Sequence, residues 1–84
     1  MVKVKLFANF REAVGSREIE IEAGSIEELL SLLIERYPKL EEYFSEDRLK
    51  DYVHIMVNGK IIEDLATKLK QDDVVAIFPP VSGG

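Results

Sequence analysis

The sequence predicts an α+β domain in which a mixed sheet of about five strands packs on one main helix. Two N-terminal segments alternate apolar and polar residues, which is typical of half-buried strands. An apolar stripe at helical spacing follows a capping motif, as expected for an amphipathic helix that covers a sheet. Residues 74–78 form a continuous apolar run, which predicts a strand in mid-sheet that is buried on both faces.

The first strand is predicted over residues 2–10, where one face carries Val2, Val4, Leu6, Ala8 and Phe10. Phe7 falls on the opposite face, together with Lys3, Lys5 and Asn9. Residues 17–22 alternate again, with Ile19 and Ile21 facing inward. Gly15-Ser16 is a turn signal between the two segments, so we expect an antiparallel hairpin with a longer loop.

The main helix is predicted to begin at Ser25, because Ser25 and Glu28 have the spacing of a capping box. Its apolar stripe consists of Ile26, Leu29, Leu30, Leu33 and Tyr37. Pro38 ends the helix, since the residue before a proline avoids the α region. A short helical turn over residues 40–44 should place Tyr43 and Phe44 against the core, and the charged residues 45–52 are expected to form a surface loop.

The second half of the chain predicts a hairpin and a final strand. Residues 52–57 have Val53, Ile55 and Val57 on one face, and Asn58-Gly59 is a strong turn signal before a return strand at 60–62. We expect a partly helical connection around Leu65 and Leu69, and then a turn at 71–73. A central last strand would run parallel to the first, which gives the β-grasp arrangement of ubiquitin-like proteins. Residues 1–78 form the domain in this prediction, and residues 79–84 form an extended reactive tail.

The composition argues against several classes of function. Eleven basic and 16 acidic residues give a net charge of −5, which disfavours nucleic acid as a partner. The absence of Cys excludes disulfides and thiolate chemistry, and no stretch has the length of a membrane span or signal peptide. We therefore expect a cytoplasmic protein that does not bind membranes.

A catalytic set of side chains is hard to assemble from this sequence. His54 is the only His, and its position in a strand favours packing on a sheet face over a role as a catalytic base. One His without Cys cannot make a tight transition-metal site, and no Gly-rich phosphate loop is present. We expect no bound metal and no bound cofactor, and whether the chain counts as an enzyme is left open.

The C-terminal tail offers chemistry that the side chains lack. Gly84 carries a backbone carboxylate that no side chain shields, so it can enter a site too narrow for a Cβ. Pro79-Pro80 favours an extended exit from the sheet, and six extended residues span about 20 Å. Adenylation by ATP would activate the carboxylate, and attack by sulfide or an amine would give a thiocarboxylate or an amide. Either reaction requires a separate activating enzyme that uses the ATP.

Several segments of the chain resemble a known family. They are Val4-Lys5-Leu6-Phe7-Ala8, Arg11-Glu12 with Gly15, Val57-Asn58-Gly59 and Phe78-Pro79-Pro80-Val81-Ser82-Gly83-Gly84. Together they resemble the small subunit of molybdopterin synthase, the MoaD family of MoaD/ThiS-type ubiquitin-like sulfur carriers. The resemblance covers the whole chain, and its C-terminal motif is the specific part. Archaeal small ubiquitin-like modifiers share the same fold and tail.

The resemblance implies a sulfur carrier. In it, an E1-like adenylating enzyme (MoeB/ThiF-like) activates Gly84 with ATP, and the product is converted to a thiocarboxylate. The tail, Pro79, Pro80, Val81, Ser82 and Gly83, then enters the large subunit of molybdopterin synthase (MoaE-like). There the sulfur passes to cyclic pyranopterin monophosphate and builds the dithiolene that later holds molybdenum or tungsten. The large subunit supplies the catalytic side chains of this transfer.

The resemblance also implies a docking patch on the sheet. Phe7 and Phe78 match its positions, Ile61 is expected to join them, and Arg11 is expected to contact a partner. Two rival functions remain open. One is a protein modifier that forms isopeptide bonds through Gly84, including bonds to its own Lys60 or Lys68. The other is a β-grasp interaction module with an inert tail.

Overall fold

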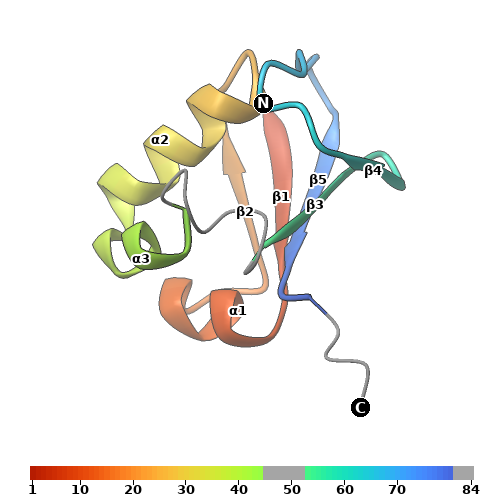
Figure 1. Ribbon diagram of the computed structural model, residues 1–84. Coiled ribbons are helices and arrows are strands. Elements are labelled where there is room, and N and C mark those ends of the chain that lie inside the picture. The colour runs from red at the N-terminus through yellow and green to blue at the C-terminus, as the bar shows by residue number, and fades with distance from the viewer. Residues whose placement is uncertain (45–52, 81–84) are drawn as a thin grey trace.

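The computed structural model describes residues 1–44 and 53–80. Within these ranges five strands form one mixed sheet in the order β2-β1-β5-β3-β4 (Figure 1). The strands are β1 Val2–Leu6, β2 Glu18–Ile21, β3 His54–Val57, β4 Lys60–Ile62 and β5 Val74–Phe78. The helices are α1 Ala8–Val14, α2 Ile26–Arg36, the short 3₁₀ helix η1 Pro38–Leu40 and α3 Glu41–Phe44.

The strand pairing agrees with the predicted topology. β1 is antiparallel to β2 and parallel to β5, and β5 lies in the centre of the sheet. β3 is antiparallel to both β5 and β4. The turn between β3 and β4 has Asn58 at φ 50° and Gly59 at φ 84°. Positive φ at both central residues is the geometry of a type I′ turn, which confirms the predicted hairpin.

The hydrophobic core lies between the sheet and the helices, which cover one of its faces (Figure 1). The largest fully buried side chains in the described residues are Phe10, Leu6, Ile26, Leu29, Leu33, Leu40, Ile77, Val2, Val4 and Val75. Phe44 is also buried, and its ring lies 5.8 Å from that of Phe10. The ring of the half-buried Tyr43 lies 5.4 Å from Phe10. The short helix α3 therefore packs on the core as the sequence predicted.

The capping motif forms at the start of α2. The Ser25 Oγ accepts a hydrogen bond from the Glu28 amide at 3.2 Å. The Glu28 Oε1 accepts from the amide of Gly24 at 3.0 Å, one residue before the Ser25 amide that a capping box uses. At the other end the helix stops at Arg36, with Tyr37 as its cap before Pro38.

The predicted strand over residues 2–10 is wrong beyond Leu6. Ala8 adopts a φ of 52° and turns the chain out of β1 into the helix α1. The alternation continued to Phe10 by coincidence, since Phe10, Ala13 and Val14 also have the spacing of one helix face. This helix, and not a strand, buries Phe10 in the core.

The prediction for β5 holds for its place in the sheet and fails for its burial. Val75 and Ile77 are fully buried, whereas Val74, Ala76 and Phe78 are only half-buried. The helices cover only one face, so the continuous apolar run leaves one row of side chains on an open face.

The connection around Leu65 and Leu69 has no helical segment, so the expected partial helix is wrong. Its backbone lies against the start of α2, where the amides of Ile26 and Glu27 donate to the carbonyls of Thr67 and Leu65. These two amides lack partners inside their own helix, and the carbonyls of the extended connection satisfy them. The loop predicted over residues 45–52 lies outside the described residues.

Candidate functional site

The end of β5 is held by the sheet on both sides. In the register, Leu6 of β1 lies opposite Ile77, and His54 of β3 lies opposite Phe78. The amide of Phe7 adds a hydrogen bond of 3.2 Å to the Ile77 carbonyl. The pairing of β5 therefore extends to Ile77 on the β1 side and to Phe78 on the β3 side.

Pro79 and Pro80 follow directly and are half-buried. Neither has an amide hydrogen, so neither can donate to a strand ladder, and the fixed φ of proline keeps this segment stiff. The predicted site residues Val81, Ser82, Gly83 and Gly84 lie outside the described residues. The described part of the site is thus the end of β5 with Pro79 and Pro80, which precede the remaining predicted tail residues.

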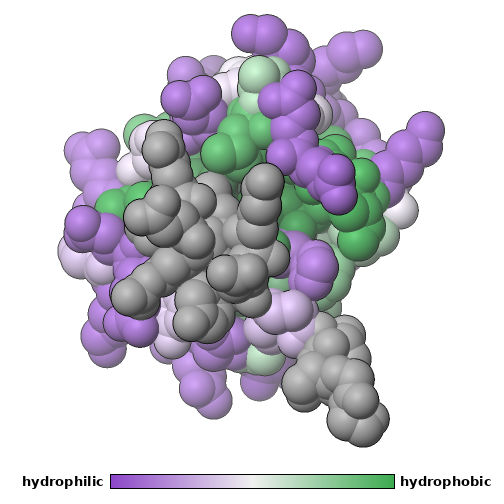
Figure 2. Space-filling model, viewed as in Figure 1, coloured by the Kyte–Doolittle hydropathy of each residue, from purple (hydrophilic) through white to green (hydrophobic). Residues whose placement is uncertain are grey.

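The open face of the sheet beside this base carries apolar side chains, which we call the apolar patch. It consists of Phe7, Met56, Ile61, Ala76 and Phe78, with His54 among them. Phe7 is 47% exposed and Ile61 is 57% exposed, so both present large apolar surfaces to solvent. Figure 2 shows hydrophobic residues at the surface beside the β3–β4 hairpin. Such a patch is typical of an interaction site.

The other half of the open face is charged. Lys3 and Lys5 of β1 lie opposite Glu20 and Glu18 of β2. The Lys3 ammonium lies 3.8 Å from the Glu18 carboxylate, and both side chains are about half exposed. These opposite charges compensate one another, so the apolar patch borders a region of the sheet face where the charged side chains are paired.

Three aromatic rings meet at the end of β5. The rings of Phe7 and Phe78 are 6.4 Å apart and nearly perpendicular, at 87°. The rings of His54 and Phe78 are 5.7 Å apart and nearly parallel, at 29°. The structure thus bears out sheet-face packing for His54. The register of β3 on β5 creates this contact, and strand periodicity alone does not indicate it.

The structure brings together three of the four residues that the sequence assigned to docking. Phe7 and Phe78 are in contact, and Ile61 lies on the same face of the sheet, in the row that it forms with Met56 and Ala76. Arg11 lies on α1 with an exposed side chain that forms no ion pair with the described residues. Met56 and Ala76 were missed, although their alternation with Ile55 and Ile77 placed them on this face.

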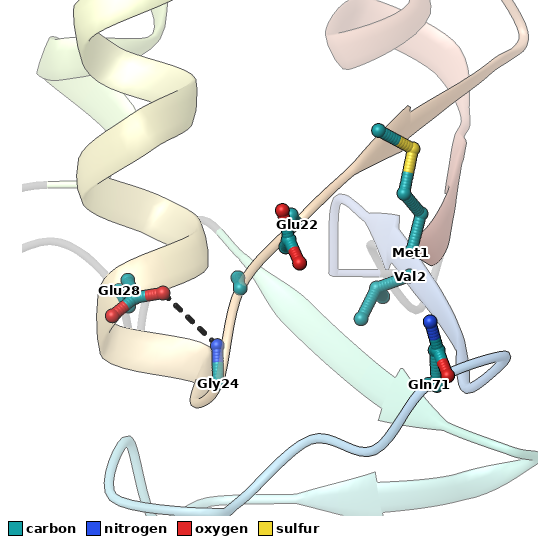
Figure 3. Close-up of a pocket in the computed structure, with 7 residues that line it drawn as sticks. Met1, Val2, Glu22, Gly24, Glu28 and Gln71 are labelled. Carbon is teal, nitrogen blue, oxygen red and sulfur yellow. Dashed lines mark hydrogen bonds between the residues drawn. The ribbon is translucent and has the colours of Figure 1, made fainter.

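A hollow of about 290 Å³ lies at the opposite end of the sheet (Figure 3). Its lining residues are Met1, Val2, Glu22, Ala23, Gly24, Glu28 and Gln71. The Glu28 carboxylate there accepts from the Gly24 amide, so it caps a helix and is not a free acid or base. Among residues 1–44 and 53–80, no group of three or more His, Cys, Asp or Glu could hold a metal ion.

The length and the apolar character of the described helices bear on whether any of them could span a membrane. Within residues 1–44 and 53–80, no helix combines the length and the apolar character that crossing a bilayer requires.

The fold and its tail base define the class of protein. A mixed five-stranded sheet wrapped on one main helix, with the last strand central and parallel to the first, is the ubiquitin-like β-grasp fold. The ThiS family model matches residues 4–84. The chain therefore belongs to the ThiS family, within the ThiS/MoaD group of ubiquitin-like sulfur carriers.

The relatives that the chain matches include both small archaeal modifier proteins and a molybdopterin synthase subunit. The chain is 32% identical to small archaeal modifier protein 3 of Haloferax volcanii, over 99% of this chain and 98% of the relative. It is 34% identical to the molybdopterin synthase sulfur carrier subunit of Chlamydomonas reinhardtii, again over 99% and 98%.

Solved structures show the same division. Small archaeal modifier protein 1 of Methanosarcina acetivorans matches with a TM-score of 0.83 and 38% identity, over 99% of this chain and 95% of the other. A complex of subunits 1 and 2 of the molybdopterin-converting factor from Helicobacter pylori contains a chain that matches with a TM-score of 0.71. The identity is 29%, over 99% of this chain and 97% of that one.

Proposed function

We propose that this chain is the sulfur carrier subunit of a molybdopterin synthase. The Gly84 carboxylate attacks the α-phosphorus of ATP on an E1-like enzyme (MoeB/ThiF-like) and releases pyrophosphate. A sulfide equivalent then displaces AMP from the acyl adenylate and leaves a thiocarboxylate. The thiocarboxylate donates its sulfur to cyclic pyranopterin monophosphate in the large synthase subunit (MoaE-like), where the catalytic side chains reside.

The observation that carries this proposal is the placement of the apolar patch directly beside the base of the tail. Phe7 and Phe78 touch at the last residue of β5, and Ile61 extends the patch across β3 to β4. A partner that covers this patch therefore lies where a tail of about 20 Å can reach into it. The Helicobacter pylori relative, solved in a complex of two subunits, supports a two-protein arrangement.

The E1-like enzyme and the large synthase subunit dock on the same residues of this chain in the proposal. We assign Phe7, Ile61 and Phe78 to docking and Arg11 to a charged contact at its margin. Pro79 and Pro80, with the three residues that follow them, form the segment that enters the partner. ATP belongs to the activating enzyme, and this chain binds no cofactor of its own in the proposal. Activation by ATP places the reaction in the cytoplasm.

Intact mass spectrometry tests the proposal. The chain is incubated with an E1-like enzyme, ATP and a sulfur donor, and the mass should rise by the difference between one sulfur and one oxygen. Deletion of Gly84 should abolish the change, because the terminal carboxylate would then belong to Gly83 and lie one residue short of the active site. An unchanged mass of the intact chain, with an enzyme that activates its own cognate carrier, would contradict the proposal.

A protein modifier is the second candidate, supported by the similarity to small archaeal modifier proteins. In this case the activated Gly84 is attacked by a lysine amine, and AMP leaves as an isopeptide bond forms. Lys60 and Lys68 are exposed and would be acceptors on the chain itself. The last basic residue before the tail is Lys70, so tryptic digestion of cellular proteins should then yield lysines that carry residues 71–84. The absence of such lysines in cells that produce the chain would remove this candidate.

A further inference from the structure

We propose that His54 is a positioning residue for the chemistry at the tail. In this inference its ring supports Phe78 and so sets the direction in which the chain leaves the sheet. The inference rests on the proposed function, because it concerns the delivery of Gly84 into a partner.

The ring of Phe78 contacts two other aromatic rings at the end of β5. Its ring meets His54 on one side and Phe7 on the other, and these two residues come from opposite flanks of β5. His54 lies directly opposite Phe78 in the strand register, so the sheet itself presents the imidazole to the ring. Offset stacked and perpendicular pairs at such separations are favourable ring geometries. Phe78 is therefore held from two directions at the last position of the ladder.

The surroundings of His54 indicate that it acts on Phe78 through its ring and not through a hydrogen bond or an ion pair. Within the described residues the side chain of His54 forms no hydrogen bond and no ion pair, and its ring contact is with Phe78. The core of the domain is secured without it, because Val75 and Ile77 bury the other face of β5 completely. Removal of the imidazole should consequently loosen the end of the strand and leave the fold intact.

Pro79 and Pro80, the two residues after Phe78, form a stiff segment at the start of the tail. Pro79 and Pro80 transmit the orientation of Phe78, since the ring of proline restricts the backbone. A rotation of about 10° at Phe78 displaces the far end of the two prolines, about 7 Å away, by roughly 1 Å. A displacement of about 1 Å at a reacting centre is enough to lower a rate about 100-fold. A small loss of support at His54 is thereby passed to the segment that leads to Gly84.

The expected kinetic signature separates positioning from docking. In the His54→Ala variant, saturation with carrier still fills the docking surface but does not restore insertion of the tail. The kcat for adenylation should fall about 5- to 10-fold, a larger effect than the rise in KM that loss of the imidazole from the apolar patch causes. Ile61→Ala is the matched control, because it removes patch surface away from the tail base. It should raise KM and leave kcat close to that of the unaltered chain.

Two further variants identify which property of His54 matters. His54→Phe retains an aromatic ring and removes the ring nitrogens, whereas His54→Gln retains hydrogen-bonding groups and removes the ring. The positioning role predicts that Phe restores kcat and that Gln does not. A Phe variant as slow as the Ala variant, or a Gln variant at full rate, would overturn the inference and assign His54 to a hydrogen bond with the partner.

A measurement on the isolated full-length chain makes the inference independent of any enzyme. Relaxation of the Phe78 amide and of the Cα–Hα groups of Pro79 and Pro80 reports their order parameters, which are about 0.85 for rigid backbone. These values should fall in His54→Ala and recover in His54→Phe. Unchanged values in His54→Ala would overturn the inference even if the sulfur-carrier function were correct. Failure of the unaltered chain to be adenylated would overturn that function, and the order parameters would still decide the role of His54.

Discussion

At the scale of single residues, Phe10 shows most clearly how the chain uses its few aromatic side chains. It is completely buried by α1 and meets both Tyr43 and Phe44. It thus connects the helix after β1 with the short helix α3. We expect Phe10→Ala to lower the free energy of unfolding by about 3–5 kcal/mol, as measured by urea denaturation. Ile61→Ala, at an exposed position, should change it by less than about 0.5 kcal/mol. Equal losses in the two variants would contradict this assignment of the core.

Asp73 gives a residue-scale prediction of pH dependence. A hydrogen bond from the Lys70 amide, followed by one from the Asn58 side chain, lowers the pKa of the Asp73 carboxyl from its ordinary value. The folded state therefore binds this proton less readily than the unfolded state does. The stabilisation is present above the ordinary Asp pKa of about 3.9 and is lost as the pH falls through the lower folded value.

The Asp73→Asn variant removes this titration. The difference in unfolding free energy between the unaltered chain and this variant should shrink as the pH is lowered below about 4. Chemical denaturation at a series of pH values measures this difference. A difference that stays constant down to strongly acid pH would show that the carboxylate does not couple to folding.

At the scale of elements, α2 owes its start to local hydrogen bonds and to a remote connection. Ser25 and Glu28 satisfy two amides at its N-terminus, and the carbonyls of Leu65 and Thr67 satisfy two more. Ser25→Ala should cost about 1 kcal/mol of stability by loss of the side-chain cap. Ser31→Ala is the matched control, since Ser31 is exposed in the middle of the same helix. Thermal unfolding of both variants checks the prediction, which fails if Ser31→Ala is as damaging as Ser25→Ala.

At the scale of the whole molecule, we expect the domain over residues 1–78 and the tail over residues 79–84 to be separable. All buried core residues of the described ranges lie between Val2 and Ile77. Removal of residues 81–84 should therefore change the free energy of unfolding by less than about 0.5 kcal/mol while it abolishes activation by an E1-like enzyme. Calorimetry together with the adenylation assay tests both halves of this statement. A large fall in melting temperature would show that the tail contributes to the fold.

Patterns of neighbouring residues predicted much of this architecture. The capping spacing of Ser25 and Glu28 located the main helix, and Asn58-Gly59 located the hairpin with its positive φ values. These features were accessible because a cap and a turn are each set by a few adjacent residues. Alternation failed at Phe10, where strand and helix spacing overlap over a short run and the turn at Ala8 decides between them. It likewise failed to show that only one face of β5 is covered.

The order of residues was sufficient to determine the β-grasp fold class and to direct attention to Gly84, because periodicity, capping and the lack of a catalytic set are properties of the linear chain. The tertiary structure alone decided which side chains surround the base of the tail. Phe7, His54 and Phe78 lie far apart in the sequence and meet only because β5 enters the sheet between β1 and β3. Strand register is a property of the assembled sheet, and it is the register that places an imidazole against the last ring before the tail.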